Sequence, residues 1–174
     1  ASTMAEAADK YVLYQESVQC PEAEVKLLRK LYKKTRGKKA RVLREAFGGT
    51  YAVSCEWVKG SKERSAWAVA LDPECIDWGP RHTLSKLKAS QKDRDHVIEG
   101  NVLDTATPKA DIIAALNFSY FIFKTRDELR DYFKATLDNL DDDGILACDM
   151  FGGHEVYEDD RREETDHGEF TYVW

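Results

Sequence analysis

Short apolar runs alternate with amphipathic stretches along this chain, and that alternation predicts parallel strands separated by helices. The clearest amphipathic stretch begins at Thr125, which stands in capping-box register with Glu128. Its apolar face is predicted to comprise Leu129, Phe133, Leu137 and Leu140. Another helical pattern begins at Pro21 and ends near Gly37, a candidate C-cap. Helices are therefore predicted over residues 21–37, 51–59, 73–87 and 125–140.

Five short apolar runs between these helices are the predicted strands, over residues 41–43, 66–71, 96–102, 111–116 and 145–150. The run 111–116 is almost wholly apolar, which is typical of a strand buried on both faces of a sheet. Residues 141–144 predict a turn and the charged stretch 90–95 a loop, whereas residues 1–8 predict an unstructured leader. The order of elements predicts an α/β fold with a doubly wound parallel sheet.

Composition is consistent with one globular domain. The chain has 174 residues, of which 43% are hydrophobic and 33% charged, and this length suits one domain rather than two. We expect that domain over residues 21–174, preceded by a leader and possible lid segment over residues 1–20. No apolar run is long enough to suggest a membrane span, and the N-terminus has no apolar stretch typical of a signal peptide.

The spacing of the cysteines and the net charge indicate which classes of ligand or partner the protein binds. The four cysteines lack a C-x-x-C pair or metal spacing, which predicts free thiols, no metal site and a reducing, cytoplasmic compartment. The net charge of −6 argues against a broad nucleic-acid surface. A basic stretch over residues 26–44 has no interleaved aromatic platform, so we interpret it as a solvated helix face and loop. A small-molecule substrate is favoured over nucleic acid or membrane.

Half of a nucleotide-type site is visible between the first two predicted strands. The first strand leads to Glu45 and to the turn Gly48-Gly49-Thr50, and Asp72 closes the second strand, 23 residues after Gly49. In an open α/β sheet, ligands bind beyond the carboxyl ends of the strands, where a helix N-terminus presents free N–H groups. An acid about 20 residues past the turn is placed to accept hydrogen bonds from a ribose. Asp72 is the predicted ribose ligand.

The glycine pattern bears on which nucleotide is bound. A dinucleotide site has the pattern G-x-G-x-x-G, because the backbone passes close to a pyrophosphate. This turn has only Gly48 and Gly49, and the neighbouring side chains of Phe47 and Tyr51 are predicted to crowd a pyrophosphate. A ligand with adenosine and no phosphates is therefore favoured, and an NAD-binding oxidoreductase is the weaker alternative.

At this turn the chain resembles the class I S-adenosylmethionine-dependent methyltransferases. The run 43–50 is most similar to an uncharacterised subgroup with a Phe-Cys-Gly-Thr turn, although Gly48 stands where that subgroup has Cys. Tyr51 stands where the broader family often has another glycine. The resemblance implies a Rossmann-like sheet with its strands in the order third, second, first, fourth, fifth, and a hairpin of two further strands closing one edge. It also implies S-adenosyl-L-methionine as cofactor and S-adenosyl-L-homocysteine as product.

The resemblance places the cofactor at the ends of the first three strands. Arg44 would hold the methionine carboxylate by a bidentate contact, or else form an ion pair with a helix. Glu45 would bind the amino group or cap the next helix, and Gly49 would allow close approach of the ligand. Asn101 would contact the adenine edge or simply form a turn, with Leu103 as a wall for the ring. The predicted cofactor-binding residues are Arg44, Glu45, Gly48, Gly49, Asp72, Pro73, Asn101, Val102, Leu103, Asn117 and Phe118.

The segment 117–120, Asn-Phe-Ser-Tyr, follows the fourth strand and resembles the family's fourth motif in position. We predict it to form the methyl-transfer end of the site, with Asn117 and Tyr120 as catalytic residues; Phe118 and Tyr120 are alternatively core aromatics. The segment does not match the Asn-Pro-Pro-Tyr pattern of amino-methylating nucleic-acid enzymes, which disfavours a base as acceptor. A sulfonium makes its methyl group electrophilic, so in-line positioning of a nucleophile can carry much of the rate.

Four further residues are candidates for the substrate side or for a lid. Tyr11 and Tyr14 precede the first long helix, in a segment that folds over the ligand in many relatives, or they serve in plain packing. Asp149 follows the fifth strand and is placed to face the substrate. His154 is the one histidine placed as a general base, with a surface histidine as the alternative.

The segment after Met150 is too short and too charged for the expected closing hairpin. It ends in 170–174, which resembles a strand that has barely begun, so the sixth and seventh strands are predicted to be largely missing. An unprotected edge on the fifth strand invites association, which predicts an oligomer, a partner chain, or a fragment of a longer protein. A non-catalytic or truncated domain that acts as a binding module is the second alternative function.

Overall fold

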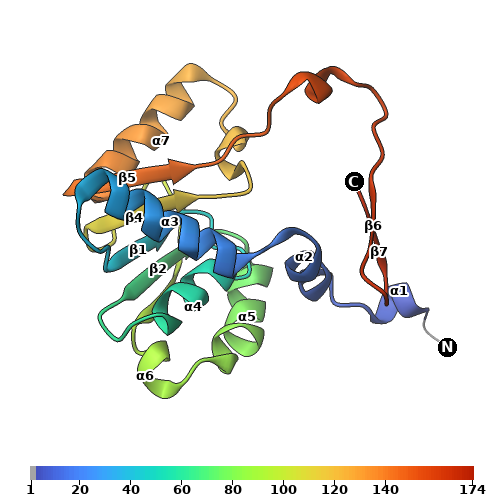
Figure 1. Ribbon diagram of the computed structural model, residues 1–174, viewed down its shortest axis with the longest axis horizontal. Coiled ribbons are helices and arrows are strands. Elements are labelled where there is room, and N and C mark those ends of the chain that lie inside the picture. Colours follow the sequence, from blue (N-terminus) through green and yellow to red (C-terminus); the bar gives the residue numbers. More distant parts are fainter. Residues whose placement is uncertain (1–2) are drawn as a thin grey trace. The chain divides into compact units, whose positions relative to one another are not determined.

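The computed structural model describes residues 3–174 (Figure 1), and residues 1 and 2 lie outside the described part. The chain divides into two compact units, of which the larger comprises Pro21–Asp149. The smaller unit comprises residues 1–20 together with 150–174. The predicted domain thus begins where the larger unit begins, whereas its last residues group with the N-terminal segment.

The larger unit is built on a five-stranded sheet in the order β3-β2-β1-β4-β5. All four neighbouring pairs are parallel, which confirms the predicted fold class and winding. The strands are β1 Val42–Glu45, β2 Ser65–Ala70, β3 Asp95–Glu99, β4 Ala110–Ala115 and β5 Leu140–Cys148. The predicted turn 141–144 lies inside β5, where the register with β4 shifts between Ala110 and Ile112. In this sheet β5 pairs with β4 alone, and association through its free edge stays a prediction.

The helices of the larger unit follow the predicted order. They are α3 Pro21–Arg36, α4 Ala52–Lys59, α5 Pro73–His82, α6 Ala89–Lys92 and α7 Arg126–Asn139, with short 3-10 helices at η1 Leu84–Lys86 and η2 Ser119–Ile122. The prediction of a loop over 90–95 holds only for residues 93 and 94, because α6 extends to Lys92 and β3 begins at Asp95. The side chain of Gln91 accepts a hydrogen bond from the Lys88 N–H at 2.9 Å, and this bond stabilises the first turn of α6.

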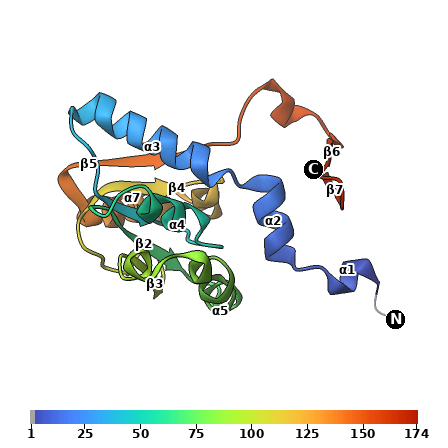
Figure 2. The same cartoon turned by 60° about the horizontal axis from the view of Figure 1, so that its bottom comes forward.

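The two faces of the sheet carry separate hydrophobic clusters. On one face, Leu43 and Ile112 pack with Leu28 and Tyr32 of α3 and with Trp57 of α4. Figure 2 shows α3 running along this face of the sheet. On the other face, Ile113 and its neighbours pack against α7. Adjacent residues of β4 thus face opposite clusters, which confirms that this strand is buried on both faces.

The predicted apolar face of α7 is only half right. Leu129 packs partly against the core, but Phe133 is 41% exposed and Leu137 is 69% exposed. The helix instead buries Tyr132, whose ring lies 5.8 Å from that of Phe47 and 5.1 Å from that of Phe123. It also buries Thr136 and Asn139, and the Asn139 side chain accepts a hydrogen bond from the Thr107 N–H at 3.0 Å. Because of these aromatic and polar contacts, α7 turns the face with Tyr132, Thr136 and Asn139 toward the core, and part of its most apolar face is exposed.

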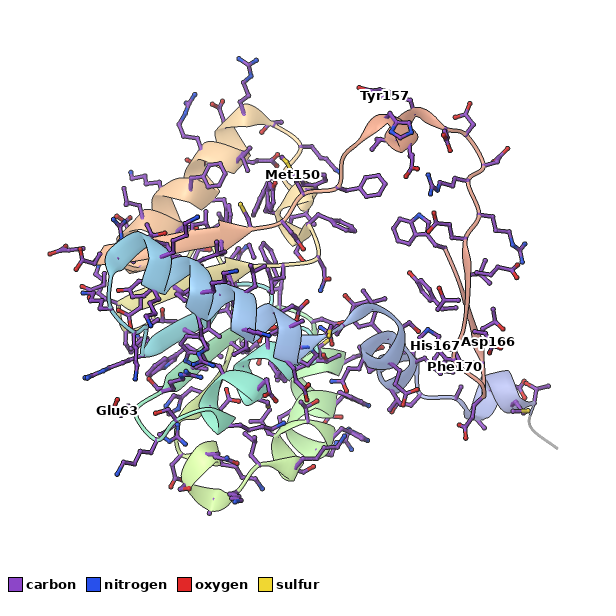
Figure 3. The ribbon with its side chains drawn as sticks, in the orientation of Figure 1. Glu63, Met150, Tyr157, Asp166, His167 and Phe170 are labelled. Atoms are coloured by element: carbon purple, nitrogen blue, oxygen red, sulfur yellow. The ribbon has the colours of Figure 1, made fainter. Side chains whose placement is uncertain are left out.

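The smaller unit contains α1 Met4–Ala7, α2 Lys10–Val18, the 3-10 helix η3 His154–Tyr157, and the strands β6 Glu164–Asp166 and β7 Thr171–Val173. The leader prediction is wrong over α1, where Thr3 and Glu6 form a capping box; residues 1 and 2 lie outside the described part. Strands β6 and β7 pair antiparallel as a two-stranded sheet of their own. At the hairpin's tip His167 stacks on Phe170 with ring centroids 4.8 Å apart (Figure 3). The short, charged C-terminal segment thus does form a hairpin, although this hairpin is not part of the main sheet.

Candidate functional site at the carboxyl ends of the strands

Most of the predicted site residues follow the carboxyl ends of the five parallel strands. Because the strands are parallel, these ends lie along one edge of the sheet (Figure 1). The fold thus brings to one edge the turn after β1, Asp72 after β2, residues 101–103 after β3, residues 117–120 after β4 and Asp149 after β5. All of these residues belong to the larger unit.

The glycine turn after β1 is held by backbone hydrogen bonds and is open on one side. The Gly48 N–H donates to the Val69 carbonyl, and the Tyr51 N–H donates to the Gly48 carbonyl, both at 2.7 Å. Gly49 has φ +44°, a left-handed conformation that favours glycine. A Cβ added there would meet only the Phe47 carbonyl oxygen, at 3.9 Å. The backbone at Gly49 therefore has open space beside it, and close approach of a ligand there stays a prediction.

The prediction that Phe47 and Tyr51 crowd a pyrophosphate is wrong, because both side chains pack into the protein. Tyr51 is the N-cap of α4 with φ +60°, and its side chain is fully buried. Its ring packs against Gly48 and Gly79, while Phe47 packs against Phe123 and Tyr132. Crowding by these side chains consequently does not separate a dinucleotide from S-adenosylmethionine.

The packing of Tyr51 on Gly79 leads to a stability prediction. A Cβ added at Gly79 would overlap the Tyr51 ring, so Gly79→Ala is expected to lower the free energy of unfolding by about 1–2 kcal/mol, even though alanine favours the helix. Urea denaturation measures this change. Gly152→Ala is the control, since an added Cβ there meets nothing within 4 Å. The packing argument fails if both variants are equally stable, or if Tyr51→Gly does not reduce the cost of Gly79→Ala.

Glu45 ends β1 as a buried carboxyl that caps the following helix. Its Oε2 accepts a hydrogen bond from the Ser54 N–H, in the first turn of α4, at 3.1 Å. Burial raises the pKa of Glu45 well above its ordinary value, and the hydrogen bond from Ser54 acts in the opposite direction. The capping alternative therefore describes the observed contact, and a contact with a ligand amino group stays a prediction.

Arg44 holds a loop of the protein itself. Its guanidinium is buried, with Nη1 donating to the Thr105 carbonyl at 2.8 Å and to Thr107 Oγ1 at 3.0 Å. Nη2 donates to the Val102 carbonyl at 3.3 Å. The alternative ion pair with a helix is not among these bonds, and the contact with a cofactor carboxylate stays a prediction. Arg44 thus ties the loop 102–107 to β1.

Asp72 begins α5 and remains exposed. Its Oδ1 accepts a hydrogen bond from the Glu74 N–H at 2.9 Å, which makes it the N-cap, and Pro73 occupies the first turn. The Cys75 thiol donates to Oδ2 at 3.5 Å. The preceding residue, Leu71, is 66% exposed at the end of β2, although its side chain is apolar. The sequence predicts Leu71 as part of the strand. It gave no sign that this side chain forms an exposed apolar surface beside Asp72.

The segment after β3 forms a compact turn around Asn101. Its Oδ1 accepts a hydrogen bond from the Leu103 N–H at 3.0 Å, and its carbonyl accepts from the Thr105 N–H at 2.9 Å. Val102 and Leu103 pack partly against the core, and both remain incompletely buried. The turn alternative for Asn101 describes these contacts, and the adenine contact stays a prediction.

The segment after β4 has an unusual backbone that is bound to β5. Asn117 and Phe118 both have positive φ, at 55° and 43°. Their N–H groups donate to the two oxygens of Asp149, from Asn117 to Oδ2 at 2.8 Å and from Phe118 to Oδ1 at 2.6 Å. Tyr120 is half-buried, and burial raises the pKa of its hydroxyl, with the charge of Asp149 acting in the same direction. Left-handed non-glycine residues concentrate at functional sites.

Other residues at this edge escaped the sequence reasoning. Ile122 is 61% exposed, and Phe121 is exposed beside it, so η2 presents apolar side chains next to the predicted catalytic segment. Glu24, in the first turn of α3, has a buried Oε2 with no hydrogen bond among the described residues. Burial raises the pKa of Glu24, and the charge of Asp149 raises it further. Its helical position gave no signal, because the fold brings it near β5 only through tertiary packing.

The remaining candidates lie in the smaller unit. Tyr11 and Tyr14 are on α2, and His154 begins η3, so the lid and general-base roles stay predictions. Across residues 3–174 the structure has no cluster of His, Cys, Asp or Glu side chains suited to a metal ion. Within the same range no helix combines the length and apolarity needed to cross a membrane.

The five-stranded order and the site at its carboxyl edge define the fold of class I S-adenosylmethionine-dependent methyltransferases. No protein-family model matches the chain, and no curated protein matches it in sequence. Among solved structures, it is similar to DesVI of Streptomyces venezuelae with a TM-score of 0.72 and 14% identity, over 95% of this chain and 64% of DesVI.

Two methyltransferase structures show the same fold. The sugar N-methyltransferase KedS8 of Streptoalloteichus has a TM-score of 0.71 and 20% identity, over 95% of this chain and 64% of KedS8. The glycopeptide N-methyltransferase MtfA, solved in complex with S-adenosyl-L-methionine, has a TM-score of 0.62 and 14% identity, over 91% of this chain and 66% of MtfA. The chain spans less than two thirds of the length of each of these three proteins.

Proposed function

We propose that this chain binds S-adenosyl-L-methionine and takes part in methyl transfer to a small-molecule acceptor, with S-adenosyl-L-homocysteine as product. The observation that carries the proposal is the accessible backbone at Gly49, with Asp72 following the neighbouring strand. The φ of Gly49 favours glycine, and a side chain there would occupy the open space that the ligand would use. Solved structures with this fold, such as MtfA, are complexes with the cofactor, which supports the same ligand here.

Different residues at the carboxyl edge of the sheet would contact different parts of the cofactor. The turn at Gly48 and Gly49 would lie against its amino-acid part, and Asp72 would accept hydrogen bonds from the ribose hydroxyls. Leu71 and the segment 101–103 offer apolar surface and an exposed amide for the adenine. When bound, the cofactor supplies an electrophilic methyl group on a sulfonium.

The segment 117–120 would hold the acceptor. Like any tyrosine hydroxyl, that of Tyr120 is protonated at neutral pH, so it is able to donate a hydrogen bond to the acceptor. Both oxygens of Asp149 accept backbone N–H groups, so Asp149 is not placed as a free general base. We infer that these residues act mainly by binding and in-line positioning of the acceptor.

Isothermal titration with S-adenosyl-L-methionine and with S-adenosyl-L-homocysteine tests this function, and micromolar binding is expected. NAD(H) is the necessary comparison, because Phe47 and Tyr51 turn inward and no longer argue against a dinucleotide. Binding of NAD(H) alone would replace the proposal with an oxidoreductase. Binding of none of these ligands by the folded chain would favour the non-catalytic binding module.

Asp72 allows a sharper test, because one substitution separates its two roles. Asp72→Ser keeps an N-cap for α5 but shortens the side chain, so we expect native stability and cofactor binding weaker by about 1–3 kcal/mol. Asp77→Ser is the matched control on the same helix, where Asp77 is exposed and pairs with Arg81. Unchanged affinity of a stable Asp72→Ser variant would remove Asp72 from the site.

A further inference from the structure

The ends of β4 and β5 are joined by one carboxylate. Ala115 and Cys148 are register partners in the two strands, so Asp149 lies one residue beyond β5 and reaches the backbone just beyond β4. Each of its oxygens accepts one N–H, from Asn117 at 2.8 Å and from Phe118 at 2.6 Å. Charge-assisted hydrogen bonds of this length are stronger than those between neutral groups. The two bonds fix the direction of two successive peptide groups.

The two hydrogen bonds hold Asn117 and Phe118 in a left-handed backbone conformation, which these residue types do not favour. Left-handed φ values cost free energy in residues other than glycine, and here two such residues follow one another. The Ser119 hydroxyl closes the same turn by donating to the Leu116 carbonyl at 2.7 Å. Tyr120 follows directly, on η2. The conformation of the predicted catalytic segment therefore depends on a residue of the neighbouring strand.

The charge of Asp149 also acts on this end of the sheet. It contributes to the raised pKa values of Tyr120, Cys148 and Glu24. No ion pair to Asp149 is present within residues 3–174, so its charge is balanced only by the two backbone N–H groups. A negative potential at this edge favours a cation beside it.

We propose that Asp149 is a positioning residue for methyl transfer: its carboxylate holds the left-handed backbone at Asn117 and Phe118, and thereby orients Tyr120. In addition, its charge favours a ligand with a sulfonium over one with a neutral thioether. This inference rests on the proposed function, because it assigns segment 117–120 to the methyl-transfer end. It revises the expectation that Asp149 itself faces the substrate.

The first experiment detects the hydrogen bonds from Asn117 and Phe118 to Asp149, and it needs no ligand. In amide NMR spectra of the whole chain, the Asn117 and Phe118 protons are expected well downfield, as for N–H groups bound to a carboxylate. Asp149→Asn should move both upfield, because an amide offers one acceptor oxygen in place of two. Asp142→Asn, an exposed position in the same strand, is the control and should leave both signals in place. Unchanged signals in Asp149→Asn would overturn the proposal.

The second experiment compares two ligands that differ in charge at sulfur. In Asp149→Asn, the preference for S-adenosyl-L-methionine over S-adenosyl-L-homocysteine should fall roughly tenfold relative to the unmodified chain. A purely structural role would weaken both ligands equally, and that result would overturn the proposed preference for a sulfonium. If the unmodified chain bound neither ligand while the downfield amide signals were present, the proposed function would fail, and with it the assignment to methyl transfer.

A second variant covers the case in which Asp149→Asn folds poorly. Glycine adopts positive φ without strain, so Asn117→Gly should make the loop less dependent on the carboxylate. The pair Asp149→Asn with Asn117→Gly is then expected to regain part of the midpoint of thermal unfolding lost by Asp149→Asn. An equal loss with and without Asn117→Gly would show that Asp149 does not hold this backbone.

Discussion

Replacing Arg44 with methionine is expected to lower the free energy of unfolding by about 2–4 kcal/mol. The guanidinium is buried and donates to two carbonyl groups and one hydroxyl in the loop 102–107. Methionine fills a similar volume but leaves these acceptors without their donors. Burial lowers the pKa of Arg44, which shows that the charge is costly to hold, and removing that cost offsets part of the loss.

Urea denaturation measures this effect, and Arg41→Met is the control, because Arg41 is an exposed arginine just before the same strand. Arg44→Lys should recover only part of the stability, since a single ammonium cannot reach all three acceptors in the geometry of a guanidinium. A stable Arg44→Met chain with much weaker cofactor binding would contradict this account. It would instead place Arg44 at the cofactor carboxylate, as the sequence predicts.

Periodicity was sufficient to predict the strands, because their positions follow from burial, whereas their order in the sheet was implied by the family resemblance. The run 111–116 is apolar on both faces, and β4 accordingly lies in the sheet's interior between β1 and β5. Helix α7 is a case in which periodicity did not predict the buried face correctly. Its most apolar stripe contains Leu137, yet the helix packs through Tyr132 and Asn139, whose partners come from distant parts of the chain. The periodicity of apolar residues within one helix does not predict contacts with residues that are distant in sequence.

The positions of the site residues were predictable, but their contacts were not. Parallel strands place every carboxyl end at one edge, so Asp72 and Asn117 follow from the strand assignments alone. The local alternatives for Glu45 and Asn101, a helix cap and a turn, were also predicted from the sequence, and both contacts are present. The contacts of Arg44 and Asp149 join residues far apart in sequence, so no local pattern could have assigned them.

The largest stabilising change is expected at Asp95, a buried acid at the start of β3. Neither of its carboxylate oxygens has a hydrogen bond of normal geometry within residues 3–174, and Ser54 and Cys55 of α4 lie beside it. Burial raises the pKa of Asp95 from 3.8 to about 6, with weaker opposing effects from Cys55 and Ser54. The fold therefore favours the protonated acid, and ionisation at neutral pH costs stability.

The sign of the pH dependence follows from this raised pKa. The contribution of Asp95 to stability is fully present below its unfolded pKa of 3.8 and is lost as the pH rises through about 6. Asp95→Asn stays neutral at every pH, so we expect it to be more stable than the unmodified chain by up to about 3 kcal/mol at pH 7.5. The difference should vanish near pH 4, where Asp95 is protonated in the folded chain. Urea denaturation between pH 4 and 8 measures it, with Asp93→Asn as the exposed control. A gain in stability that did not depend on pH would show that packing, and not ionisation, separates aspartate from asparagine at this position.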